Sequence, residues 1–169
     1  MGALILDASV LMGLLDSADA HHDSAVSAVE RADQAGQPLV APASAYAEAL
    51  VAFARAGRAD EARDAIAGMG ITIAPLTAAM ADRAAAVRAQ YRDLRLPEAI
   101  VVACAEALEA DLLSYDQRLR HLFPGETGDV DGRAAQSSAP IATASDPSLP
   151  PRWIVEHQAV AEQFESQDD

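Results

Sequence analysis

Four acidic residues, Asp7, Glu48, Glu98 and Asp116, each stand at the edge of an otherwise apolar segment. Carboxylates are rarely fully buried unless they are paired with a cation or bound to a metal ion. Four of them, each where an element begins or turns over, therefore indicate one convergent acidic site. Carboxylate oxygens suit hard divalent cations, so the pattern predicts a site for Mg²⁺ or Mn²⁺.

The elements that must position these acids alternate between short apolar runs and longer segments of helical period. This alternation predicts βαβ units and a parallel sheet. We expect strands at 3–6, 38–41, 71–74 and 111–114, and helices at 8–16, 20–35, 43–56, 58–68, 77–92, 97–109 and 116–122. Ligands bind beyond the carboxyl ends of parallel strands. Asp7 and Asp116 directly follow strands, and Glu48 and Glu98 lie early in helices, so all four can reach that edge.

Composition limits the classes of protein that need consideration. A chain of 169 residues is about one domain long, and a net charge of −14 argues against tight non-specific binding to nucleic acid. The single cysteine, Cys104, lies in an apolar helical pattern and is expected to be a buried core thiol. No signal peptide and no membrane-spanning run is apparent, so a cytoplasmic protein is expected.

The composition changes after Pro124. We expect one domain at 1–124, followed at 125–169 by an acidic linker and tail rich in Pro, Ser and Ala. Within the tail, 152–165 is either a short docking helix or part of a disordered segment.

Simpler structural roles exist for some of these residues. Asp7 and Asp116 are each placed to cap a helix, and Glu98 after Pro97 is an ordinary helix start that favours the helix dipole. Capping does not explain Glu48, which lies inside a helix among apolar residues. The cluster at 21–23, His-His-Asp, is better explained as a solvated helix start than as a metal site.

Taken in order, the motifs resemble those of a PIN domain, specifically a VapC-type toxin ribonuclease of a type II toxin–antitoxin system. They are the run 4–11 (LILDASVL), the helical Glu48, the run 94–99 (LRLPEA) and the run 112–116 (LLSYD), and the similarity spans about residues 3–124. The resemblance implies a three-layer α/β/α sandwich with a short parallel sheet. It also implies a Mg²⁺-dependent endoribonuclease, with Mn²⁺ as an alternative ion, an RNA substrate, a cognate antitoxin and a homodimer.

Hydrolysis of a phosphodiester needs an activated water and neutralisation of the phosphate charge, and bound Mg²⁺ can supply both. We expect Asp7 and Glu98 to be the principal catalytic and metal-binding residues, completed by Glu48 and Asp116. Ser9 and Ser114 are expected to support the site by orienting a carboxylate or a bound water. Arg95 is expected to contact RNA phosphate. The antitoxin is expected to dock on the apolar helices at 43–68.

The sequence departs from the family pattern at Glu98, where the family usually has Asp. The longer side chain alters the reach of the carboxylate, and Asp93 is the alternative third acid. The departure motivates a competing hypothesis, a catalytically impaired PIN-fold module that binds RNA or protein. A receiver-like phosphoacceptor is a third hypothesis, disfavoured because the chain has no Lys. The family's last strand is poorly represented at 126–130.

Overall fold

The computed structural model describes residues 2–122, which contain four strands and seven helices. The strands are β1 (Leu4–Leu6), β2 (Leu39–Pro42), β3 (Thr72–Ala74) and β4 (Asp111–Leu113). The helices are α1 (Ala8–Leu15), α2 (His22–Gln34), α3 (Ala43–Arg55), α4 (Ala59–Gly68), α5 (Ala78–Gln90), α6 (Leu96–Ala107) and α7 (Gln117–Leu122).

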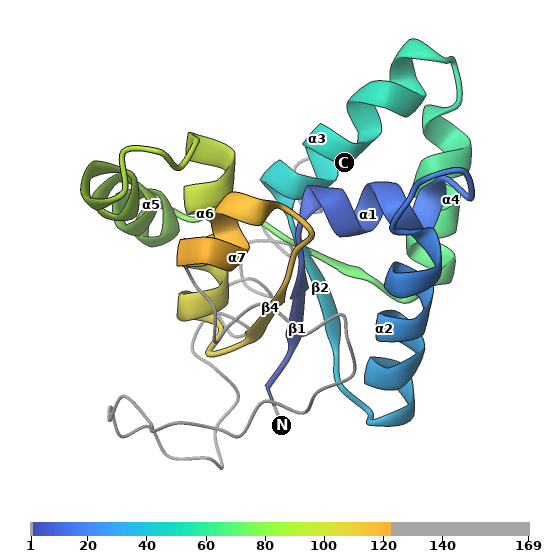
Figure 1. The fold of residues 1–169 in the computed structure, drawn as a ribbon, viewed down its shortest axis with the longest axis horizontal. Helices are drawn as coiled ribbons and strands as arrows, with labels where there is room; N and C mark the ends of the chain where they lie inside the picture. The colour runs from blue at the N-terminus through green and yellow to red at the C-terminus, as the bar shows by residue number, and fades with distance from the viewer. Residues whose placement is uncertain (1, 123–169) are drawn as a thin grey trace, which may run out of the picture. The chain divides into compact units, whose positions relative to one another are not determined.

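The four strands form one parallel sheet in the order β3-β2-β1-β4. In the register of the central strand β1, Leu4 pairs with Leu39 of β2 and with Asp111 of β4. Parallel connections are almost always right-handed, so the return from β3 to β4 must cross the face opposite to the earlier connections. Figure 1 shows this arrangement, with α5 and α6 on one side of the sheet and α1 and α2 on the other. The predicted α/β/α sandwich is confirmed.

The core is built from small and medium-sized aliphatic side chains, as the low aromatic content predicts. All three residues of β1 are buried, and α6 is buried along most of its length because it packs against α5 and against the sheet. Cys104 of α6 is 1% exposed, and burial raises the pKa of its thiol to about 11. This cysteine is therefore a protonated core thiol, as expected.

Every strand and helix expected within residues 2–122 is present, and the differences are confined to element ends. The second helix begins at His22 instead of residue 20. Asp16 and Asp19 accept hydrogen bonds from the backbone N–H groups of Ala18 and His21, which favours turns in this stretch. The expected tail at 125–169, its short helix and the weak strand at 126–130 lie outside the described residues. None of the described helices is long and apolar enough to cross a bilayer.

Candidate active site

Asp7 lies where β1 ends at the carboxyl edge of the sheet. Its backbone N–H donates to the carbonyl of Leu113 (3.1 Å), so the ends of β1 and β4 are held together. Asp7 occupies the N-cap position of α1, but its side chain makes no capping hydrogen bond. Instead, Asp7 Oδ2 accepts hydrogen bonds from Ser9 Oγ (3.0 Å) and Ser114 Oγ (2.8 Å). The capping role considered for this side chain is therefore not observed.

The two serines also fix the segment that follows β4. The backbone N–H of Tyr115 donates to Ser9 Oγ, and that of Asp116 donates to Ser114 Oγ, both at 3.0 Å. Each hydroxyl thus donates to Asp7 and accepts from the turn that carries Asp116. Ser114 is 1% exposed and Asp7 is 6% exposed, so this network lies beneath the surface. It sets the position of Asp116 relative to Asp7.

Asp116 combines a capping role with a place in the acidic cluster. Its Oδ1 accepts from the backbone N–H of Arg118 (2.7 Å) at the start of α7. Its Oδ2 lies 3.9 Å from Arg95 Nη2. The two oxygens therefore serve different functions, one structural and one directed at the cluster.

Glu98 is buried at the start of α6, where it is 2% exposed. Its Oε2 accepts a hydrogen bond from the backbone N–H of Arg95, the N-cap residue, as the Glu of a capping box does. Its Oε1 accepts from Arg95 Nε (2.5 Å). Pro97 fits the first turn because no intrahelical partner exists there for an N–H. In contrast, Asp93 lies exposed in the preceding turn.

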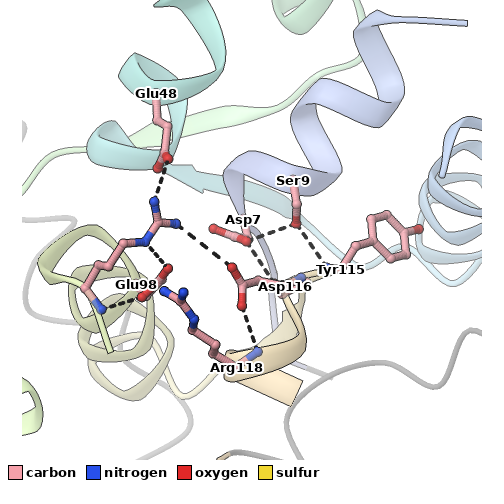
Figure 2. Close-up of polar contacts among 9 residues, drawn as sticks. Asp7, Ser9, Glu48, Glu98, Tyr115, Asp116 and Arg118 are labelled. Atoms are coloured by element: carbon pink, nitrogen blue, oxygen red, sulfur yellow. Dashed lines mark hydrogen bonds and ion pairs between the residues drawn. The ribbon is translucent and has the colours of Figure 1, made fainter. Parts of the chain in front are cut away.

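Glu48 completes the cluster from α3, the helix that follows β2 without a break. Its Oε1 lies 3.9 Å from Arg95 Nη1, and its side chain is 39% exposed. Figure 2 shows Glu48, Glu98 and Asp116 arranged around one guanidinium, with Asp7 beside Asp116. The structure therefore brings together all four acids that the sequence singled out.

Arg95 lies between these acids. The hydrogen bond that Arg95 donates to Glu98, and then the negative charge of Glu98, raise the pKa of Arg95 above its ordinary value, with smaller contributions from Glu48 and Asp116. The guanidinium therefore remains charged at every working pH. Within residues 2–122, no three acid, histidine or cysteine side chains are grouped closely enough to hold one metal ion in this arrangement.

The donor set nevertheless fits a divalent cation. Three carboxylates already face a single positive charge, and carboxylate oxygens are preferred ligands of Mg²⁺ and Mn²⁺. Both hydrogen bonds to Asp7 go to Oδ2, and no described residue donates to its Oδ1. One guanidinium does not neutralise four carboxylates. The chemistry of these carboxylates therefore suits such an ion, although their spacing within residues 2–122 does not form a metal site in this structure.

Two neighbours of the cluster were not singled out from the sequence. Figure 2 shows the side chain of Arg118 extending from α7 toward the side of the cluster where Glu98 lies. The one sequence feature that could have indicated Arg118 is its position two residues after Asp116. The ring of Tyr115 points away from the cluster and stacks on His21 at 4.4 Å between ring centroids. His22 contacts the carbonyl of Gly13 through Nδ1 (2.8 Å), so the His-His-Asp run packs locally.

Comparison with solved structures identifies similar folds. A toxin–antitoxin complex from Klebsiella pneumoniae superposes with a TM-score of 0.59 at 22% identity, covering 73% of this chain and 94% of that one. VapC20 of Mycobacterium tuberculosis, a toxin that cleaves the sarcin–ricin loop, gives a TM-score of 0.58 at 16% identity, with coverages of 72% and 95%. VapBC2 of Rickettsia felis, bound to a promoter DNA fragment, gives 0.59 at 11% identity, with coverages of 72% and 93%.

The sequence comparisons give the family. No match was found among curated proteins. The model of the PIN domain family matches residues 4–122, which include all four acids and the whole described sheet. A family match over most of the chain excludes the receiver-like hypothesis. The chain belongs to the PIN domain family.

Proposed function

We propose that this chain is a VapC-type toxin, an endoribonuclease that hydrolyses RNA phosphodiester bonds in the cytoplasm with Mg²⁺ or Mn²⁺. The observation that carries the proposal is the convergence of four acids at the carboxyl edge of a PIN-domain sheet, three of them around one cation. Nucleases of this family generally use divalent metal ions. The likeness to solved toxins and toxin–antitoxin complexes supports the same function.

In this proposal Asp7 and Glu98 are the principal metal ligands, and Glu48 and Asp116 complete the site. A divalent ion held by these residues would supply activation of a water molecule and neutralisation of charge on the phosphate. Asp7 is held for this task by the hydroxyls of Ser9 and Ser114, which leave its Oδ1 open. Misplacement of a catalytic group by about 1 Å can cost on the order of 100-fold in rate. The paired serine donors therefore serve as positioning residues.

A structured RNA is the proposed substrate class, because one similar protein is a toxin that cleaves the sarcin–ricin loop. The purified full chain should cleave structured RNAs when Mg²⁺ or Mn²⁺ is present and should stop when EDTA is added. Product ends mapped by primer extension would give the cleavage position. RNA that is bound but never cut with any divalent ion would favour the binding-only hypothesis, to which the engagement of both Glu98 oxygens by Arg95 also lends weight.

A basic antitoxin is the proposed partner, and the toxin is proposed to be a homodimer. One of the similar structures is a toxin–antitoxin complex. Another is VapBC2 bound to a DNA fragment from its promoter. The net charge of −14 favours fast encounter with an Arg- or Lys-rich segment. The docking face is assigned to α3 and α4, where Val51 is 46% exposed and Leu50 and Phe53 are partly exposed. Figure 1 shows this pair of helices extending beyond the sheet.

Expression from the native operon should give a stoichiometric complex with a small basic protein. Val51→Glu should weaken that complex roughly tenfold or more, because a charge would be buried in an apolar contact. Leu76→Glu is a matched control, since Leu76 is also 46% exposed but lies between β3 and α5. Pull-down and calorimetry with both variants provide the measurement. Recovery of the free protein alone at native expression would contradict the proposed partner.

A further inference from the structure

Arg95 occupies a position in the acidic cluster that the proposed reaction does not explain. Among the described residues, it is the one basic side chain with an ion pair to any of the four acids, and it contacts Glu48, Glu98 and Asp116 together. These three acids come from α3, from α6 and from the turn after β4. The guanidinium therefore lies where the proposed divalent ion would need ligands.

The contacts of Arg95 are unequal. Its Nε is 2.5 Å from Glu98 Oε1, a short charge-assisted hydrogen bond. Its Nη1 lies 3.9 Å from Glu48 Oε1, and its Nη2 lies 3.9 Å from Asp116 Oδ2. Both distances are beyond hydrogen-bonding range. The Arg95 side chain is also 54% exposed. It can therefore turn into solvent without burying its charge.

We propose that Arg95 is an internal counter-cation that competes with the divalent ion for Glu48, Glu98 and Asp116. This inference rests on the proposed function, which places a metal site at these acids. The guanidinium compensates the clustered negative charge while no metal is bound, and it leaves the carboxylates when the ion binds. Metal affinity is thereby set below the value that the bare acids would give.

Two features make this exchange feasible. A guanidinium and a divalent ion that share the same carboxylates repel one another, so their binding is mutually exclusive or strongly antagonistic. The start of α6 does not depend on the Arg95 side chain, because Glu98 Oε2 accepts from the backbone N–H of Arg95. The side chain can therefore leave while Glu98 keeps its orientation.

Calorimetric titration of the full chain with MnCl₂ tests the competition. Arg95→Ala and Arg95→Gln should bind Mn²⁺ more tightly than wild type, on the order of tenfold. Close charges in a low-dielectric site would give a larger change in Mn²⁺ affinity than this, and a screened pair on the surface would give a smaller one. Arg83→Ala is the matched control, because it removes the same charge and breaks an exposed ion pair to Glu106 of α6. The affinity of that control should equal wild type.

Thermal unfolding of the same proteins gives a second readout. Without metal, Arg95→Ala should melt below wild type, since Glu48, Glu98 and Asp116 lose their counter-cation. With saturating Mn²⁺, Arg95→Ala and wild type should have the same melting temperature. The increase in melting temperature on adding metal should therefore be larger in the variant. Arg83→Ala should change the melting temperature by the same amount without Mn²⁺ and with saturating Mn²⁺.

The wild-type titration separates the two proposals. If wild type binds Mn²⁺ and both Arg95 variants bind it equally or more weakly, the competition is refuted while the metal site stands. If neither wild type nor any variant binds Mn²⁺, the metal site fails and the competition fails with it. Binding by the Arg95 variants alone would support the competition in its strongest form.

Discussion

Asp7→Asn is expected to reduce RNA cleavage by on the order of 100-fold or more while leaving the fold intact. The substitution removes one negative charge from a proposed metal ligand. It should therefore weaken the binding of the divalent ion that would activate the water. An Asn carbonyl oxygen can still accept from Ser9 and Ser114, so the network beneath the site should persist. The loss should therefore appear in activity and not in the solubility or the helix content of the protein.

Metal-dependent stabilisation provides an independent measurement of the same substitution. Millimolar Mg²⁺ or Mn²⁺ should raise the melting temperature of wild type, because an ion that binds only the folded state stabilises it by mass action. Asp7→Asn should remove most of that increase. Asp82→Asn, on the exposed surface of α5, is the control for the change of charge and should keep the full increase. A melting curve of wild type that neither ion shifts would count against a metal site.

The sequence predicted those parts of the site that depend on local pattern and strand order. Asp7 and Asp116 each follow a short apolar strand, and in a parallel sheet the ends of neighbouring strands share one edge. Their proximity follows from topology alone. Glu48 was found by a different signal, a charge inside an apolar helical pattern.

The position of Arg95 was not predictable in the same way. The sequence placed it beside the site with RNA phosphate as its expected contact, and that contact stays a prediction. The structure places its guanidinium among three acids. Two of those acids are distant in sequence, and ion pairs at 3.9 Å depend on how α3, α6 and the β4–α7 turn pack together. Local sequence carries no information on such spacing.

The serine network shows the same limit. Ser9 and Ser114 were expected to orient a carboxylate or a water, from their positions next to Asp7 and Asp116. The hydrogen bond from the backbone of Tyr115 to Ser9 joins segments 106 residues apart and was not expected. It arises because β1 and β4 are neighbours in register, so the residues that follow them meet. The chain thereby uses two hydroxyls both to position Asp7 and to satisfy a buried turn.

Glu98→Gln is expected to abolish detectable RNA cleavage, a loss on the order of 100-fold or more, because it removes the charge of the proposed third ligand and keeps its shape. The structure predicts that this variant folds normally. A Gln side chain still accepts the hydrogen bond from the backbone N–H of Arg95, and Gln serves this capping position as well as Glu does. The Gln amide nitrogen cannot accept from Arg95 Nε, so the metal-free melting temperature should fall, while circular dichroism should stay close to wild type.

Glu98→Asp should preserve or raise the cleavage rate, because it restores the shorter reach that the family pattern has at this position. Asp93→Asn is the matched test of the alternative ligand. Asp93 is exposed in the turn before α6, whereas Glu98 is buried against the guanidinium that also contacts Glu48 and Asp116. We therefore expect Asp93→Asn to cleave RNA at the wild-type rate. Inactivation by Asp93→Asn together with a near-silent Glu98→Gln would transfer the role to Asp93. Full activity of both variants would exclude either acid as an essential ligand, since a metal site cannot lose the charge of a principal ligand without a measurable loss of rate.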